Sequence, residues 1–216
     1  VLNPSLGWLD QVMESHKQLV TASGSNARLI IVDDGSADLK EELKLEDSGI
    51  TLIKLPFNQG KGAALRKGFE IADAPIVLFT DIDFPYEIDS MVNVIRSVEN
   101  GADVSLGYRE DDYYDRVPLF RKMMSESFRF VLKTILRFPI TDTQCGLKGM
   151  NQRGKAIFMQ TKINRFLVDM EFIIHALQLE THDGMRPQLG PAIDALEAAG
   201  HLNADFAKAF TLMARL

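Results

Sequence analysis

The chain has 216 residues, 46% of them hydrophobic and 25% charged, a composition typical of a soluble globular protein with one domain of ordinary to large size. Thirty acidic residues against 24 basic ones argue against binding along a nucleic-acid backbone, so any affinity for phosphate must be local. No run of about 18 apolar residues predicts a membrane span. The single cysteine, Cys145, cannot form an internal disulfide, and no charged-then-apolar leader opens the chain, so we expect a cytoplasmic location.

The first half of the chain alternates between helical and strand patterns. Apolar residues recur at helical spacing from Ser5 to Val20, which predicts a first helix with Ser5 as its cap. Helical patterns follow at about 60–72 and 86–99. Four short apolar runs bounded by turn-forming residues predict buried strands: "ARLIIVDD", "GITLIKL", "APIVLFTD" and "ADVSLGY". This order predicts an α/β fold with a Rossmann-like, mainly parallel sheet and helices on both faces.

After Pro118 the sequence becomes helical. Long amphipathic patterns run through "LFRKMMSESFRFVLKTILRF" and "FLVDMEFIIHALQLE". The last stretch predicts two short helices broken at Gly200. We therefore expect one α/β domain over residues 1–180 and a helical tail over 181–216, whose helices pack on the domain or join copies into a homo-oligomer.

Two acidic clusters, "VDDGSAD" and "DID", directly follow predicted strands. Ligands of open α/β sheets bind beyond the carboxyl ends of the strands, so we expect both clusters to face one crevice. Asp81 and Asp83 stand at positions i and i+2, which in an extended segment point the same way and would hold one divalent ion. For Asp34 the alternatives are a hydrogen bond to a ribose or base and a capped turn, and a solvated loop is the alternative for the second cluster.

A glycine-rich helix start, "NQGKGAALRKG", places Asn58 and Lys61 around Gly60 and Gly62. Free backbone amides and the helix dipole favour an anion at such a position, so the segment predicts contact with a phosphate. It is not a P-loop, because no Gly-Lys-Ser/Thr stands at the needed spacing. An ordinary helix opened by glycine is the alternative.

Basic residues follow the last of these predicted strands, in "GYRE" and "RKMMS". Arg121 and Ser125 are four positions apart, so on a helix they share one face and can bind one phosphate, and a solvated basic face is the alternative. Further along, "DTQCGLKGM" holds Asp142, and "VDME" holds Asp169 and Glu171. The four histidines show no metal-ligand spacing.

The order of these motifs resembles that of the family-two glycosyltransferases of the A-type fold, most closely the dolichyl-phosphate or polyprenyl-phosphate sugar transferases. The matching features, in order, are "VLNP", "VDDGSAD", "NQGKGAALRKG", "DID", "GYR" with "RKMMS", and "DTQCGLK" with "VDME". The last pair is most similar to the glucosyl branch. The resemblance implies an A-type glycosyltransferase domain over residues 1–180.

For function, the resemblance implies an inverting, metal-dependent hexosyltransferase that uses Mg²⁺ or Mn²⁺. It would move a hexose, glucose favoured, from a donor of the UDP-glucose or GDP-mannose type to a polyprenyl or dolichyl phosphate. A lipid acceptor implies peripheral contact with the cytoplasmic membrane face. The donor-binding residues would be Asn3, Asp34, Asn58, Lys61 and Asp81, and the metal ligands Asp81 and Asp83.

The resemblance also assigns the acceptor side. Arg109, Arg121 and Ser125 would contact the acceptor phosphate. Asp142 lies in the segment that closes over the sugar. Together with Asp83, these residues form the predicted catalytic set.

The sequence departs from the family pattern at several points. It begins where the family's first strand should just have ended, so we expect the sheet to lack that strand. Pro4 replaces an acid that touches the nucleotide, and Phe84 and Pro85 stand where the family often has a glutamine, so neither can complete a metal's ligand shell.

Two alternative functions stay open. One is transfer to a saccharide hydroxyl in polysaccharide synthesis, with Asp142 or Glu171 as the general base. The other is a non-catalytic module that binds nucleotide sugar or assembles with partners.

Overall fold

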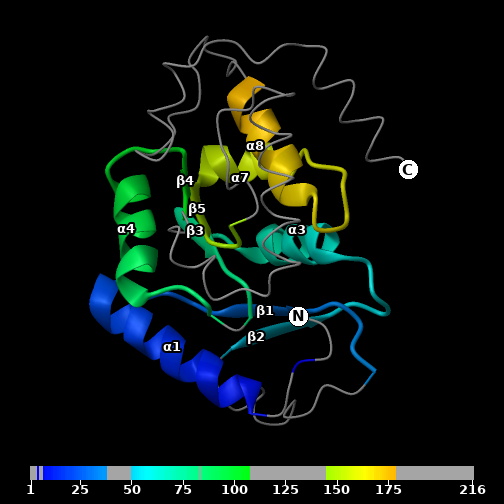
Figure 1. The fold of residues 1–216 in the computed structure, drawn as a ribbon, viewed down its shortest axis with the longest axis horizontal. Helices are drawn as coiled ribbons and strands as arrows, with labels where there is room; N and C mark the ends of the chain where they lie inside the picture. The colour runs from blue at the N-terminus through cyan, green and yellow to red at the C-terminus, as the bar shows by residue number, and fades with distance from the viewer. Residues whose placement is uncertain (1–3, 5–6, 38–49, 83, 108–144, 179–216) are drawn as a thin grey trace, which may run out of the picture.

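The computed structural model describes residues 4, 7–37, 50–82, 84–107 and 145–178, and the structural statements below concern these residues (Figure 1). Helices and strands alternate along most of this length. The described helices are α1 (Trp8–Ser23), α3 (Lys61–Ile71), α4 (Ile88–Glu99), α7 (Gln152–Phe158) and α8 (Val168–Gln178). The described strands are β1 (Ile30–Asp33), β2 (Thr51–Lys54), β3 (Ile76–Phe79), β4 (Val104–Leu106) and β5 (Lys148–Asn151).

The described strands form two sheets. β1 and β2 pair in parallel, with Ile30 opposite Thr51. β5 lies between β3 and β4 and runs antiparallel to both, with Phe79 opposite Lys148. The prediction of one mainly parallel sheet does not describe these ladders, because β5 was not predicted. Its sequence "KGMN" lacks the β-branched run that indicated the other four strands.

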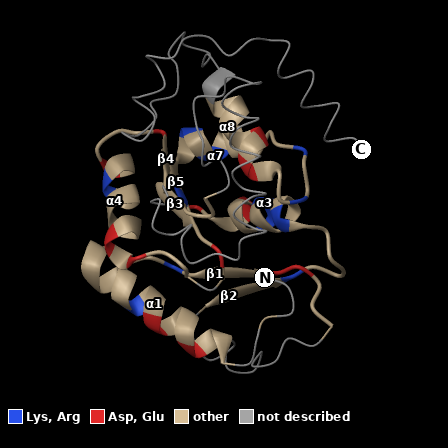
Figure 2. Ribbon diagram, in the orientation of Figure 1, with Lys and Arg blue, Asp and Glu red and all other residues tan. Residues whose placement is uncertain are grey.

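The predicted first helix is confirmed as α1, but the predicted cap is wrong, because the helix begins at Trp8 and its N-cap residue is Gly7 rather than Ser5. Trp8 and Leu9 are buried against Ile31 of β1. Asp10 and Glu14 lie on the exposed side, so the outer surface of the helix carries charge (Figure 2). This division between an apolar and a charged side is the reason the segment forms a helix over the β1–β2 pair.

Helix α4 covers one face of the β3–β5–β4 sheet, as Figure 1 shows on its left side. Met91 and Val94 of α4 share a buried cluster with Leu147, which directly precedes β5. A Cβ on Gly149 would lie 2.7 Å from Cγ1 of Val94. The missing side chain at Gly149 therefore lets α4 approach the middle of the sheet closely.

An aromatic cluster covers the opposite face of the same sheet. Phe79 of β3 meets Phe69 of α3 and Phe158 of α7 edge to face, with ring centroids 5.8 Å apart in both pairs. Phe172 of α8 continues the cluster, 5.0 Å from Phe158. Large buried rings of this kind dominate core energetics. They hold α3 and α8 against the sheet, and Phe79 is the last residue of β3, next to the candidate site.

Several predicted elements are confirmed and others fall outside the described residues. The helical patterns near 60–72 and 86–99 are α3 and α4, and "FLVDMEFIIHALQLE" contains α8. The pattern over 119–138 and the tail over 181–216 lie outside, so those helices and the tail's role stay predictions. Within the described part of the chain, no helix is both long and apolar enough to cross a membrane.

Candidate active site

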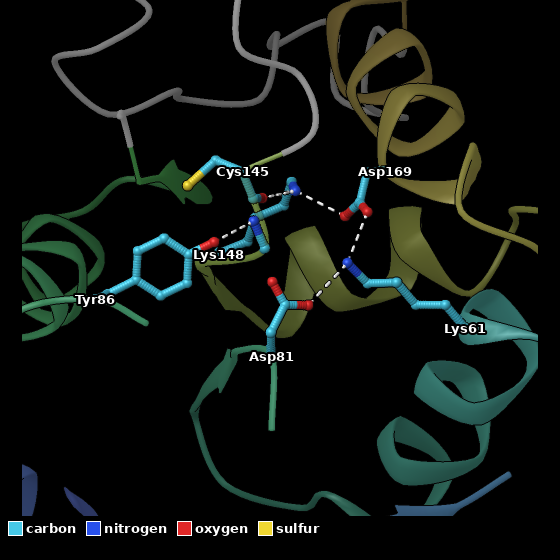
Figure 3. Close-up of polar contacts among 7 residues, drawn as sticks. Lys61, Asp81, Tyr86, Cys145, Lys148 and Asp169 are labelled. Atoms are coloured by element: carbon cyan, nitrogen blue, oxygen red, sulfur yellow. Dashed lines mark hydrogen bonds and ion pairs between the residues drawn. The ribbon is translucent and has the colours of Figure 1, made fainter. Parts of the chain in front are cut away.

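The segment after β3 and the segment before β5 pass unusually close to each other. Because Phe79 pairs with Lys148 in antiparallel register, two residues further on Asp81 lies opposite Gly146. A Cβ on Gly146 would overlap the Asp81 carboxylate, so any other residue there would force the carboxylate or the backbone to shift. The Gly146 N–H donates a 2.7 Å hydrogen bond to the hydroxyl of Tyr86, which fixes the segment over Asp81 (Figure 3).

Four charged side chains form a network of alternating sign at this point (Figure 3). Lys61 is the first residue of α3. Its Nζ lies 3.3 Å from Oδ1 of Asp81 and 3.0 Å from Oδ2 of Asp169. Oδ1 of Asp169, in the first turn of α8, lies 2.7 Å from Nζ of Lys148. The order is Asp81, Lys61, Asp169, Lys148, and we call these four residues the charge network.

The charge network runs from the interior to the surface. The side chains of Lys148 and Asp169 are 1% and 3% exposed. Those of Lys61 and Asp81 are 31% and 38% exposed. One end is therefore part of the core, and the other end is available to a ligand.

The pKa values of the two central groups, Lys61 and Asp169, are shifted by their charged neighbours. Burial alone would lower the pKa of the Lys61 ammonium, but the carboxylates of Asp169 and Asp81 outweigh it and raise that pKa above its ordinary value. Burial alone would raise the pKa of Asp169, but Lys148 and Lys61 outweigh it and lower that pKa. Both groups are therefore charged at neutral pH.

Among the described residues, the buried side chain of Lys148 contacts Asp169, Cys145 and Phe79. Besides Asp169 it donates a 2.5 Å hydrogen bond to the carbonyl of Cys145, and it lies 5.3 Å from the centre of the Phe79 ring. An isolated charge in a protein interior is costly unless it is paired and hydrogen-bonded. The pairing with Asp169 explains how β5, a strand that begins with a lysine, is buried.

Asp34 organises the loop between β2 and α3. Its carboxylate oxygens accept hydrogen bonds from the backbone N–H groups of Gln59 (2.8 Å) and Gly60 (2.9 Å). Asp33 makes a local turn, accepting from the N–H and hydroxyl of Ser36 (3.1 and 2.6 Å). A carboxylate has further lone pairs, so a contact from Asp34 to a nucleoside stays a prediction.

The start of α3 differs from the predicted anion site. The N–H of Gly62 donates to the carbonyl of Asn164 at 2.6 Å, and the N–H of Ala63 reaches the same oxygen at 3.4 Å. A Cβ on Gly60 or Gly62 would overlap the carbonyls of Asn164 and Ile163 respectively. These glycines thus serve a close contact between two backbones, and the side chain of Lys61 is the cationic group that a phosphate can reach.

The loop that caps α3 is held by two charged side chains. Nη1 of Arg66 donates to the hydroxyl of Thr161 (3.0 Å) and the carbonyl of Ile163 (3.1 Å). The carboxylate of Glu171 accepts from the N–H groups of Lys162 (3.0 and 2.9 Å) and Ile163 (2.8 Å). Glu171, a candidate general base from the sequence, is thereby engaged in fixing this loop.

Comparison with known proteins identifies the family. The sequence profile of glycosyl transferase family 2 matches residues 6–158, a stretch that includes Lys61, Asp81 and Lys148. The chain belongs to glycosyl transferase family 2. A dolichyl-phosphate beta-glucosyltransferase of Trichomonas vaginalis is 31% identical over 162 residues, which cover 70% of this chain and 50% of that protein.

Two further matches extend the comparison. A dolichyl-phosphate beta-glucosyltransferase of Saccharomyces cerevisiae is 26% identical over 213 residues, covering 83% of this chain and 64% of that protein. The chain thus spans between 50% and 64% of the length of these two relatives. The glucosyl-3-phosphoglycerate synthase of Mycobacterium tuberculosis, crystallised with Mn²⁺, UDP-glucose and glycerol 3-phosphate, matches with a TM-score of 0.55 at 17% identity, over 92% of this chain and 74% of that one. This match shows the A-type glycosyltransferase fold.

The backbone of this family member turns directly after Asp81. The N–H of Phe84 donates to the Asp81 carbonyl at 3.1 Å, and Phe84 has φ of 45°, which is uncommon for a residue other than glycine. The extended segment predicted here is therefore wrong, because the chain is already turning. Asp83 lies outside the described residues, and among the described ones no three His, Cys, Asp or Glu side chains gather as a metal site.

The predicted site residues of this family member divide into two groups. Lys61 and Asp81 are brought into contact, and Asn58 is exposed in the loop that Asp34 holds. The others lie outside the described residues, so their roles stay predictions: Asn3, Asp83, Arg109, Arg121, Ser125 and Asp142.

Sequence reasoning noted Asp169 but did not connect it to Lys148, and it gave Tyr86 no role. The available signal was a lysine in the apolar run "CGLKGM" and two acidic residues, Asp169 and Glu171, in the apolar run "FLVDMEFII". Charged side chains in such runs are seldom buried unless they are paired. A lysine in one apolar run and an acidic residue in another therefore predict an ion pair between the two runs.

Proposed function

We propose that this family 2 member transfers a hexose, glucose favoured, from a nucleotide-diphosphate sugar to a polyprenyl or dolichyl phosphate, with inversion at the sugar. The observation that carries the proposal is the exposed end of the charge network. It sets the carboxylate of Asp81 and the ammonium of Lys61 side by side just past the end of β3. Ligands of α/β sheets bind at such strand ends, and a sugar diphosphate needs a cation for its phosphate oxygens.

The choice of substrates is supported by the relatives. Both glucosyltransferases compared above are named for transfer to dolichyl phosphate. The synthase that shares the fold was crystallised with UDP-glucose. We therefore favour UDP-glucose as donor and a polyprenyl phosphate as acceptor, which implies peripheral contact with a membrane.

We propose that Asp81 takes part in holding a Mg²⁺ or Mn²⁺ ion. Such ions are commonly held by one or two carboxylates together with substrate phosphates. Asp81 supplies one partly exposed carboxylate, and we propose Asp83 as the second. When bound, the metal neutralises the charge that develops on the departing nucleoside diphosphate. Lys61 contributes a second positive charge on the same side.

The acceptor side follows from the chemistry of the nucleophile. A polyprenyl phosphate is largely ionised at pH 7, its second pKa being about 6, so it needs placement more than deprotonation. We propose that Arg109, Arg121 and Ser125 supply this placement and that Asp142 belongs to the segment closing over the sugar. A hydroxyl acceptor would need a general base, and Glu171, one of the two candidates for that role, already accepts hydrogen bonds from the backbone of Lys162 and Ile163.

The proposal is tested by a transfer assay on the purified protein. UDP-glucose or GDP-mannose is offered with a polyprenyl phosphate, with and without Mn²⁺, and both nucleoside diphosphate and sugar-lipid are measured. We expect matched, Mn²⁺-dependent formation of both products from UDP-glucose. Asp81→Asn should reduce it roughly 100-fold or more, because the metal's charge stabilisation is lost. Asp73→Asn, at an exposed acid paired with Arg28, is the control.

Two results would contradict the proposal. Sugar transfer to a saccharide but not to the lipid phosphate would favour polysaccharide synthesis. Calorimetric binding of UDP-glucose and Mn²⁺ without any release of nucleoside diphosphate would favour a non-catalytic binding module.

A further inference from the structure

We infer that Lys61 is an exchangeable counter-ion: it neutralises Asp81 in the free protein and moves to the donor diphosphate when the nucleotide binds, with Asp169 as its anchor. Metal and nucleotide then bind at Asp81 together, and the metal alone binds weakly. This inference rests on the proposed function, because it concerns the same site.

The geometry shows which contact of Lys61 is the anchor. Its Nζ is 3.0 Å from Oδ2 of Asp169 and 3.3 Å from Oδ1 of Asp81. Asp169 is buried and also bound to Lys148, whereas the Asp81 side chain is 38% exposed. Exposed ion pairs contribute little net free energy because water competes for them. The contact with Asp81 is thus the one that yields.

Asp169 qualifies as a positioning residue because its own place does not depend on Lys61. Its second oxygen is held at 2.7 Å by Lys148, which is fixed in turn by the carbonyl of Cys145. Lys61 is attached to this anchor by four flexible methylene groups, which allow its ammonium to shift by some ångströms while staying near Asp169.

The charges explain why the exchange occurs on nucleotide binding. With Lys61 at 3.3 Å, the negative charge of Asp81 is already compensated, so a divalent cation arriving alone competes with an ammonium. A diphosphate offers Lys61 a partner of higher negative charge and frees Asp81 for the metal. The metal and the nucleotide therefore each strengthen the binding of the other.

The test compares metal binding without nucleotide in matched variants. Mn²⁺ alone is titrated into the wild-type protein and into Lys61→Met, Lys61→Arg and Lys67→Met, with free Mn²⁺ followed by electron paramagnetic resonance. Lys61→Met should bind Mn²⁺ roughly two- to fivefold more tightly than the wild type, because the ammonium that competes for Asp81 through an exposed ion pair is removed. Lys61→Arg keeps the charge and should resemble the wild type.

Lys67→Met is the matched control. Lys67 lies on the same helix as Lys61, but its partner is Glu70 at the surface. The Lys67→Met variant should therefore bind Mn²⁺ with the same affinity as the wild type. Thermal unfolding verifies that each variant is folded. Folding of Lys61→Met is expected, because Asp169 keeps Lys148 as its partner.

Titration with UDP completes the test. A merely structural role of Lys61 would not change the affinities for UDP and Mn²⁺ in opposite directions. Lys61→Met should bind UDP more weakly in the absence of metal, although it binds Mn²⁺ more tightly. If UDP binding weakens while Mn²⁺ affinity stays unchanged, Lys61 is a phosphate contact only and the exchange is refuted. If the wild type binds neither UDP nor Mn²⁺ with UDP, the proposed function fails and the exchange fails with it.

Discussion

The two ends of the charge network make the same kind of ion pair in opposite surroundings. At the inner end, Lys148 and Asp169 are 1% and 3% exposed and lie 2.7 Å apart. At the outer end, Lys61 and Asp81 are about one third exposed and lie 3.3 Å apart. Desolvation makes the inner pair costly to break, whereas water screens the outer pair. The inner pair is therefore a scaffold, and the outer pair is free to respond to a ligand.

The largest effect on stability is expected when Asp169, the carboxylate of the inner pair, is replaced. Asp169→Ala leaves the ammonium of Lys148 buried with the Cys145 carbonyl as its remaining described hydrogen-bond partner. Removing one partner of a buried ion pair typically costs about 3 to 5 kcal/mol, because the other charge is left uncompensated. We expect a loss of that size in the free energy of unfolding, measured by denaturant titration at pH 7.

Two controls sharpen the prediction. Adding Lys148→Met to Asp169→Ala removes the stranded charge and should recover part of the loss. Because the lysines hold the pKa of Asp169 below its ordinary value of 3.8, its contribution is full above that pH and disappears as the pH falls through the lower folded value. The difference in unfolding free energy between the wild type and Asp169→Ala should narrow below pH 3.8. A difference that stays constant would contradict the negative charge assigned to Asp169.

The second prediction concerns the approach of Gly146 to Asp81. Gly146→Ala places a methyl group where the Asp81 carboxylate lies, so the carboxylate or the segment before β5 must shift. A displacement of about 1 Å in a catalytic site can cost on the order of 100-fold. We expect kcat/KM for sugar transfer to fall by about this factor, measured with UDP-glucose and Mn²⁺.

Gly68→Ala is the matched control for Gly146→Ala. The added methyl would meet only the side chains of Val32, at 3.3 Å, and Ile30, at 4.0 Å, in the interior of a helix where alanine is favoured. If Gly146→Ala kept full activity, the close approach to Asp81 would have no part in catalysis.

The third prediction concerns the hydroxyl of Tyr86. Tyr86→Phe removes the acceptor of the Gly146 N–H while keeping the ring. Loss of one hydrogen bond in a partly buried place costs about 1 kcal/mol. We expect that decrease in the free energy of unfolding, together with a smaller loss of activity than for Gly146→Ala. An equal loss in both variants would mean that Tyr86 touches the substrate directly.

The sequence predicts the parts of this fold whose causes are local. β1 to β4 and helices α1, α3, α4 and α8 were recognisable because their apolar residues repeat at strand or helix spacing. β5 was missed because its sequence "KGMN" has no β-branched apolar run, and the burial of Lys148 at its start depends on Asp169 in another element. The short helix α7, capped by Asn151, has too few turns for a periodic signal.

The candidate site likewise has some features that local sequence predicts and others that depend on contacts between distant elements. Asp34, Lys61 and Asp81 were predicted from their positions after strands and at a helix start, and the structure brings Lys61 and Asp81 together. The contact of Gly146 with Asp81 was not predictable, because it depends on the register of β5 against β3. Pairings set by register and by packing between distant elements are fixed by tertiary structure rather than by local sequence.

The smallest expected effect lies at the outer end of the network. Lys61→Met removes an ammonium that is 31% exposed, so its cost in unfolding free energy at pH 7 should stay below about 1 kcal/mol. The carboxylates hold the pKa of Lys61 above 10.5 despite burial, so its contribution is full below pH 10.5 and is lost as the pH rises through the higher folded value. The difference between wild type and Lys61→Met should therefore vanish at strongly alkaline pH. A cost comparable to that of Asp169→Ala would show that both ends are scaffold, and Lys61 would then be too firmly held to exchange.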